Sequence, residues 1–136
     1  MSKVFIDTNI LVYALDGADP EKQTQARALL KSIRESDSGV LSTQVLQEFF
    51  VVATGKLKVN PQAAKEMTFS LANFETVTVD LPIISQAIDI CCSNKISFWD
   101  SLIISAAATS GCRMIWTEDM NHNQMVKGVF IENPFK

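Results

Sequence analysis

Two hydrophobic periodicities alternate along this chain, and that alternation restricts its fold more than any other feature. Short apolar runs typical of strands, such as Val4-Phe5-Ile6, are each followed by a longer stretch with apolar residues at helical spacing. Signals such as Asn60-Pro61 and Gly111 separate these segments, because they favour the start and the end of a helix. Parallel strands need long crossovers between them, and the helices supply these. The pattern therefore predicts an α/β fold around a short, mainly parallel sheet.

The same signals give the expected boundaries. Strands are expected at about residues 3–7, 39–42, 75–79, 113–117 and 129–132. Helices are expected at about residues 8–15, 21–36, 44–57, 61–73, 82–93 and 98–110. Thr43 and Ser97 precede two of these helices, and both are expected to act as N-caps.

Length and composition predict one domain over residues 1–136. A chain of 136 residues with 47% hydrophobic content buries about two-thirds of its surface on folding, so one core is enough. Neither a membrane span nor a leader pattern is visible in the sequence, which predicts a cytoplasmic protein. The net charge of −3 argues against a broad basic surface for nucleic acid. It does not exclude a nuclease, because bound metal ions would cancel the charge of clustered acids.

The cysteines and the only histidine exclude several kinds of site. Cys91, Cys92 and Cys112 are odd in number, and their spacing suits neither a disulfide framework nor a tetrahedral zinc site. We expect them to be buried as small apolar groups. His122 is the single imidazole of the chain, so a mechanism that needs two is excluded.

Acidic residues stand where a ligand site is expected. Asp7 ends the first strand, and in an open parallel sheet ligands bind at the carboxyl ends of the strands. Glu48 lies among apolar helical neighbours such as Val45 and Val52, where a carboxylate is costly unless it is paired or binds metal. Asp100 lies in the first turn of an apolar helix, and Asp119 follows a later strand.

Each acid also has a purely structural interpretation. Asp7 and Asp119 suit turns or helix caps, and Glu118 is an alternative ligand beside Asp119. Glu48 suits a helix edge with its carboxylate in water. Asp100 completes a capping-box pattern with Ser97 and suits the helix dipole. The coincidence of all four acids favours a shared site.

A cluster of carboxylates without His or Cys partners favours Mg²⁺ or Mn²⁺ over zinc. Such ions lower the pKa of a bound water and stabilise the charge that develops on a phosphoryl oxygen. No Gly-rich phosphate loop, Ser-His-Asp set or activated cysteine competes with this interpretation. The acids therefore predict metal-dependent hydrolysis of phosphodiesters.

Several runs of residues together resemble the PIN domain family, and the resemblance covers essentially the whole chain. The runs are Val4-Phe5-Ile6-Asp7-Thr8-Asn9, the helix with Glu48, Phe98-Trp99-Asp100-Ser101-Leu102-Ile103, Trp116-Thr117-Glu118-Asp119 and the tail from Val129 to Phe135. The resemblance implies a three-layer α/β/α sandwich, Rossmann-like, and a metal-dependent endoribonuclease. It implies that Asp7, Glu48, Asp100 and Asp119 are the catalytic metal ligands. It also implies that Thr8, Asn9 and Thr117 hold these carboxylates.

Within this family the chain looks most like the VapC-type toxins of type II toxin-antitoxin pairs. The resemblance implies a homodimer that cleaves RNA and is neutralised by a small cognate antitoxin protein. The antitoxin's C-terminal segment would cover the acids and insert a basic side chain among them, which suits a self-repelling group of carboxylates.

Three alternatives stay open from the sequence. One is a non-toxin PIN nuclease of RNA processing. Another is an aspartyl-phosphate phosphohydrolase, but that chemistry usually needs a second Asp where Asn9 stands. The third is a domain that only binds RNA or protein. RNA specificity is expected from shape and from contacts to single-stranded or looped segments. No basic-aromatic patch stands out, and residues such as Lys56 and Lys31 are interpreted as ordinary solvated positions.

Overall fold

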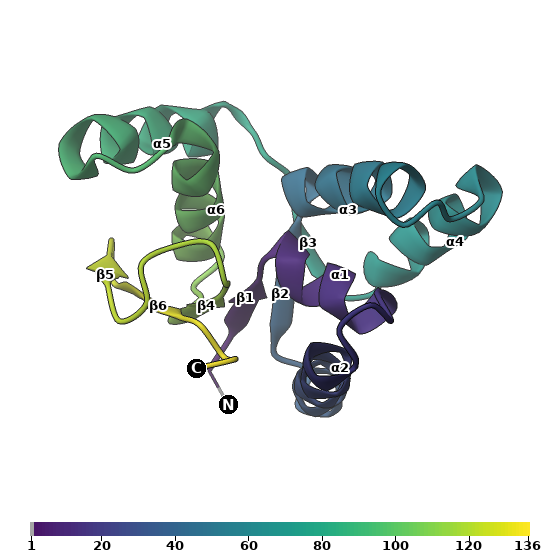
Figure 1. The fold of residues 1–136 in the computed structure, drawn as a ribbon. Coiled ribbons are helices and arrows are strands. Elements are labelled where there is room, and N and C mark those ends of the chain that lie inside the picture. The colour runs from purple at the N-terminus through teal and green to yellow at the C-terminus, as the bar shows by residue number, and fades with distance from the viewer. Residues whose placement is uncertain (1) are drawn as a thin grey trace.

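The computed structural model describes residues 2–136 and is built around one sheet with six strands in the order β3-β2-β1-β4-β6-β5 (Figure 1). The strands are β1 (Val4–Ile6), β2 (Gly39–Ser42), β3 (Glu75–Val77), β4 (Met114–Trp116), β5 (Met125–Val126) and β6 (Val129–Glu132). The helices are α1 (Thr8–Leu15), α2 (Pro20–Glu35), α3 (Thr43–Gly55), α4 (Pro61–Leu71), α5 (Leu81–Asn94) and α6 (Phe98–Thr109). All strand neighbours are parallel except β5 and β6.

The strand order places helices on both faces of the sheet. From β1 through β2 to β3 the chain moves in one direction, with α1 to α4 as crossovers; from β3 to β4 it returns past β1, with α5 and α6 as the crossover. Right-handed crossovers put these two groups on opposite faces. Figure 1 shows α5 and α6 on one side of the strands and α1 to α4 on the other. The expected three-layer α/β fold is confirmed.

Two elements that lead to the site, β1 and α6, are buried over most of their length. Phe5 and Ile6 of β1 are fully buried, because neighbouring strands and both helical layers enclose this central strand. The segment from Ser101 to Ala107 in α6 is buried along its whole length, as its apolar sequence predicts, and the helix packs against β2, β4 and β6. The ends of these two rigid elements carry Asp7 and Asp100, so both acids are anchored in the core.

One predicted helix cap is wrong. Ser42, not Thr43, caps α3: its Oγ accepts a hydrogen bond from the N–H of Val45 at 3.3 Å. Thr43 is already the first helical residue, because β2 runs into α3 without a loop. Its Oγ1 instead accepts from the N–H of Val79 at 3.1 Å. The expected caps Asn60 and Ser97 are confirmed.

Two further expectations differ from the structure. The hairpin of β5 and β6 is not expected from the sequence, because its two-residue turn is Lys127-Gly128, with positive φ at both positions, where Asn-Gly is the usual signal. The cysteines are not uniformly buried. Cys112 is buried, but Cys91 is only half-buried and Cys92 is exposed on α5.

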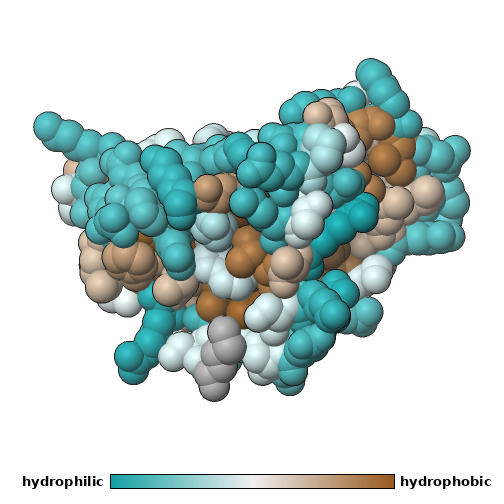
Figure 2. All heavy atoms as spheres, turned by 60° about the horizontal axis from the view of Figure 1, so that its bottom comes forward, coloured by the Kyte–Doolittle hydropathy of each residue, from teal (hydrophilic) through white to brown (hydrophobic). Residues whose placement is uncertain are grey.

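The exposed apolar side chains gather on particular helices. Figure 2 shows the face at the bottom of Figure 1, and hydrophilic residues cover most of it. Among the described residues, large exposed apolar side chains belong to α3 through α6 with the exception of Met125; they are Phe50, Val51, Met67, Phe69, Leu81, Ile88 and Trp99. No helix within residues 2–136 combines the length and the apolar character needed to cross a bilayer.

Candidate active site

The candidate site lies where the chain reverses its direction across the sheet. Strands β1 and β4 are parallel neighbours; α1, which follows β1, lies in one helical layer, and α6, which precedes β4, lies in the other. Such a switch point opens a crevice at the strand ends, which is where ligands bind in α/β sheets. Asp7 follows β1, and Thr117 to Asp119 follow β4. The N–H of Asp7 donates to the carbonyl of Trp116 at 3.0 Å, which joins the two strand ends directly.

Asp7 is a buried carboxylate that also caps α1. Only 4% of the surface of Asp7 is exposed to solvent. Oδ1 accepts a hydrogen bond from the N–H of Thr8 at 2.7 Å, and Oδ2 accepts from the Thr117 hydroxyl at 2.7 Å and the Asn9 amide at 3.3 Å. A carboxylate offers about four acceptor positions, so these three donors leave one on Oδ1. The cap and the ligand interpretations of Asp7 are therefore compatible.

Burial and neighbouring negative charges both disfavour the ionised form of Asp7. Desolvation raises the pKa of Asp7 from 3.8 to about 6, against the opposing effect of the hydrogen bonds from Thr117 and Thr8. The negative charges of Asp119 and Glu48 raise this pKa further. No Lys or Arg pairs with Asp7 among residues 2–136. A divalent cation would offset both the cost of burying the charge of Asp7 and its repulsion from Asp119 and Glu48.

Asn9 connects Asp7 to Asp119. Its Nδ2 donates to Asp119 Oδ2 at 2.9 Å as well as to Asp7, and its Oδ1 accepts from the N–H of Glu118 at 3.2 Å. The N–H of Asp119 donates to Thr117 Oγ1 at 3.1 Å. The first turn of α1 and the loop after β4 are thus fixed to each other by side chains. Asn9 therefore hydrogen-bonds to the carboxylates of both Asp7 and Asp119, and the Thr117 hydroxyl donates to Asp7.

Glu48 and Asp100 approach from the two helical layers. Thr8 Oγ1 donates to Glu48 Oε1 at 2.7 Å, so the half-buried Glu48 is held toward the end of β1. Asp100 is half-buried near the start of α6, where Ser97 Oγ accepts a hydrogen bond from its N–H at 3.1 Å. Desolvation raises the pKa of Asp100, the Ser97 hydroxyl opposes this, and the charge of Asp119 adds to it.

All four predicted acids line one cavity of about 530 Å³, which we call the acid cavity. Its lining residues are Asp7, Thr8, Asn9, Val12, Gln44, Gln47, Glu48, Val51, Val52, Lys56, Trp99, Asp100, Ile103 and Asp119. In the described part of the chain no three acidic, histidine or cysteine side chains stand close enough to chelate one ion as they are. The carboxylates surround a space, and a cation would draw them together. Oxygen donors without histidine or cysteine fit Mg²⁺ or Mn²⁺.

Glu118 points away from the acid cavity and holds the loop after β4. Tyr13 donates its hydroxyl proton to Glu118 Oε1 at 2.6 Å, and Lys22 forms an ion pair with Oε2. Burial raises the pKa of Glu118, but the hydrogen bonds from Lys22 and Tyr13 outweigh it and the pKa lies below its ordinary value. The Lys22 ammonium also lies 4.8 Å from the centre of the Tyr13 ring. Glu118 therefore already has its cation, whereas Asp119 faces the cavity.

Several residues of the cavity wall are missed by the sequence-based prediction. Trp99 and Lys56 line the acid cavity, although Lys56 is expected to be an ordinary solvated residue. Gln44 lies behind them, and its Nε2 donates to the carbonyl of Trp99 at 3.2 Å. Trp99 directly precedes Asp100, which is the one local signal that places it at the site. His122 has a structural role: its Nδ1 accepts from the N–H of Asn133 at 2.9 Å.

Solved structures with a similar fold include several toxin-antitoxin proteins. A toxin-antitoxin complex from Klebsiella pneumoniae matches 98% of this chain and 98% of its own, at 19% identity and a TM-score of 0.72. DNA-bound VapBC from Salmonella typhimurium matches 97% of this chain and 98% of its own, at 17% identity and a TM-score of 0.71. VapC20 of Mycobacterium tuberculosis, a sarcin-ricin loop cleaving toxin, matches 86% and 90% at 15% identity and a TM-score of 0.66. At sequence identities this low, these similarities show that the proteins share a fold and no more.

The sequence itself gives the family. No curated protein sequence matches the chain. The model of the PIN domain, however, matches residues 4–128, from the start of β1 to the turn before β6. This range contains all four acids of the cavity. The chain belongs to the PIN domain family.

Proposed function

We propose that this protein is a Mg²⁺- or Mn²⁺-dependent endoribonuclease. The observation that carries the proposal is the convergence of four carboxylates, from four separate elements, on one cavity at the switch point of the sheet. Asp7 is the strongest part of it, because a buried carboxylate with a pKa near 6 and no cationic partner is costly unless a metal ion binds.

The residues of the acid cavity have two proposed roles, to bind the metal and to orient the residues that bind it. Asp7, Glu48, Asp100 and Asp119 would hold the metal, which supplies an activated water and neutralises charge on the phosphate. Thr117 and Asn9 fix the orientation of Asp7, and Thr8 fixes that of Glu48. Because the pKa of Asp7 lies near 6, this carboxyl is mainly ionised at neutral pH and protonates as the pH falls. Acid conditions therefore weaken metal binding.

The structural neighbours favour RNA as the substrate and a toxin as the role. One of them is described as cleaving the sarcin-ricin loop, a segment of RNA, and others are toxin-antitoxin complexes. We infer a toxin of a type II pair that acts on RNA in the cytoplasm. A PIN nuclease of RNA processing would use the same site, and the cellular substrate separates these two roles.

A cognate antitoxin protein is the partner that the surface favours. A groove between α3 and α4, lined by Leu46, Phe50 and Phe69 among others, shares Gln47 and Val51 with the acid cavity. An apolar segment in this groove would continue into the acids, where a basic side chain would replace the metal. We also propose a homodimer, which the resemblance to VapC-type toxins implies. Co-purification with the product of an adjacent gene, and light scattering of the purified protein, test these two assemblies.

The aspartyl-phosphate alternative loses support in the structure. A nucleophilic Asp must reach its substrate, but Asp7 is only 4% exposed, and three donors already occupy its oxygens. The position that such enzymes use for a second acid holds Asn9, which bridges Asp7 and Asp119. No feature of the site favours this chemistry over metal-dependent hydrolysis.

Cleavage of RNA tests the proposed function. Purified protein, free of antitoxin, should cut a structured RNA with Mg²⁺ or Mn²⁺, lose this activity in EDTA and recover it when metal is added in excess. Cleavage that persists unchanged in EDTA would rule out the metal-dependent mechanism.

Substitutions of Asp119 and of its neighbour Glu118 test which of the two acids is the fourth metal ligand. We expect Asp119→Asn to lower the cleavage rate about 100-fold, because a metal ligand contributes several kcal/mol to the transition state. Glu118→Gln should lower it less than about 10-fold, since Gln keeps an acceptor for Tyr13 and Glu118 only supports the loop. Single-turnover rates at saturating Mn²⁺ check this order. The reverse order would make Glu118 the ligand.

A further inference from the structure

The acid cavity has an aromatic wall beside its acids. Trp99 is 65% exposed, although tryptophan is the largest side chain, and it stands next to Asp100. Trp116, the other tryptophan, is buried in β4 at 8% exposure. A large flat ring left in water at the mouth of a polar site is a candidate contact for a ligand.

Residue Trp99 is held at its backbone and at its ring, and the ring lies outside the core. Its carbonyl accepts a hydrogen bond from the buried Gln44 of α3 at 3.2 Å, which ties the start of α6 to the opposite helical layer. Phe98 contacts the ring edge to face, with 5.3 Å between the ring centres. A fixed backbone and a supported ring give a preorganised flat surface next to Asp100.

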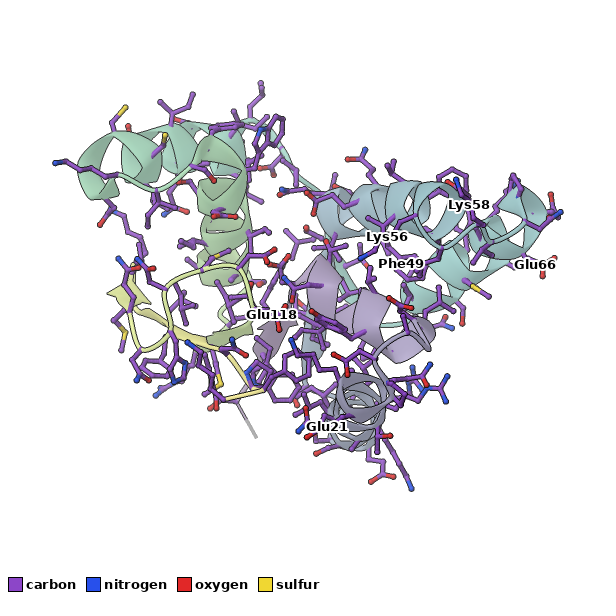
Figure 3. All side chains as sticks on the ribbon, in the orientation of Figure 1. Glu21, Phe49, Lys56, Lys58, Glu66 and Glu118 are labelled. Atoms are coloured by element: carbon purple, nitrogen blue, oxygen red, sulfur yellow. The ribbon has the colours of Figure 1, made fainter. Side chains whose placement is uncertain are left out.

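Lysines stand on both sides of the acids. Lys56, at the end of α3, lines the acid cavity, and Figure 3 shows it on the side of α1 that faces α3. A second cavity of about 170 Å³ shares Asp100 and Asp119 with the first and is lined by Lys95 and the polar Asn121. Neither ion pair within residues 2–136 involves these two lysines. Their charges are available to a ligand that spans the acids.

From this geometry we propose that Trp99, Lys56 and Lys95 form a subsite for unpaired RNA. The base next to the scissile bond stacks on Trp99, and the two lysines contact phosphates on either side of the acids. Aromatic rings bind any base by stacking, and lysines bind phosphate as point charges. A base inside a duplex cannot stack on a protein ring, so this subsite selects single-stranded or looped RNA. The inference rests on the proposed nuclease function and adds the form of its substrate.

Binding and cleavage are measured separately to test this subsite. Binding uses the Asp7→Asn protein, in which cleavage should be at least about 100-fold slower, and a fluorescein-labelled pool of random single-stranded RNA of about 12 nucleotides. Fluorescence anisotropy follows the binding. Trp99→Ala should weaken binding about 5- to 150-fold, and Trp99→Phe should restore most of the affinity. Phe69→Ala is the matched control, because Phe69 is an equally exposed aromatic residue on α4, at 67%.

The lysines and the form of the RNA give two further readouts. Lys56→Ala and Lys95→Ala should each lower the slope of log affinity against log salt by about 0.7, whereas Lys31→Ala on α2 should not change it. A duplex of the same sequence length should bind more weakly than the single strand. Quenching of tryptophan fluorescence by the RNA should disappear in Trp99→Phe, because Trp116 is buried.

Each outcome separates the subsite from the proposed function. If the wild type cuts RNA but Trp99→Ala binds as tightly as Phe69→Ala, or no RNA binding is detected, the subsite is wrong and the nuclease assignment stands. Equal binding of duplex and single strand also overturns the subsite. If Trp99→Ala weakens binding but the wild type never cuts, the subsite is supported and the nuclease assignment fails.

Discussion

Replacing Asp7 with Asn should lower the rate of RNA cleavage by at least about 100-fold without lowering the stability of the fold at neutral pH. The activity falls because an amide is a poor ligand for Mg²⁺ and removes one of the charges that hold the ion. Stability is kept because Asn has nearly the same shape, and because ionising the buried Asp7 opposes folding. Single-turnover cleavage and thermal unfolding of the two proteins check both parts.

Asp16→Asn is the matched control for this substitution. Asp16 lies at the other end of α1, where its carboxylate accepts from the N–H of Ala18 at 2.9 Å, outside the acid cavity. Its removal should leave cleavage within about twofold of the wild type. If Asp7→Asn cleaves as fast as Asp16→Asn, Asp7 is not a ligand of the catalytic metal. A loss of activity together with unfolding would show that Asp7 serves the fold and not the reaction.

The stability of the metal-free protein should fall as the pH rises from about 4 to about 6, because of Asp7. Its pKa in the folded state is raised from 3.8 to about 6, so the folded protein holds this proton more tightly than the unfolded chain does. The resulting stabilisation is complete below pH 3.8 and is lost as the pH rises through 6. A difference of this size corresponds to about 3 kcal/mol.

Other groups titrate in the same range, so the useful quantity is the difference between wild type and Asp7→Asn. In EDTA, the free energy of unfolding of the variant minus that of the wild type should grow by about 2 kcal/mol between pH 4 and pH 7. Urea unfolding at several pH values measures it. Adding Mg²⁺ at pH 7 should stabilise the wild type and not the variant. A difference that stays constant with pH would show that Asp7 is not desolvated.

The sequence predicts the layers of this fold because its local signals agree with one another. The run from Val4 to Ile6 ends in an acid and passes directly into a helix, and the apolar α6 has to be buried on all sides. The hairpin at Lys127-Gly128 is missed because lysine gives no signal for a left-handed turn. The cap at Ser42 is misplaced by one residue because nothing in the local pattern shows that the strand continues without a loop into the helix.

The acids of the site are predictable, but their surroundings are not. Asp7 and Asp119 follow strands, and the hydrophobic periodicity of the sequence predicts where these strands end. The exposure of Trp99 and the position of Lys56 depend on how α3 packs relative to α6, which no local pattern encodes. The same holds for Glu118 in the loop after β4, whose partners Tyr13 and Lys22 come from α1 and α2. Only the tertiary structure therefore distinguishes the surroundings of Glu118 from those of Asp119.

Binding of Mn²⁺ tests the central claim most directly, because it requires no knowledge of the RNA that the protein cuts. Isothermal titration of the antitoxin-free protein at pH 7 should show binding that is competed by Mg²⁺, weakens as the pH falls below 6, and is lost in Asp7→Asn and Asp100→Asn but not in Asp16→Asn. If Asp7→Asn and Asp100→Asn bind Mn²⁺ as tightly as the wild type, the acid cavity is not a metal site.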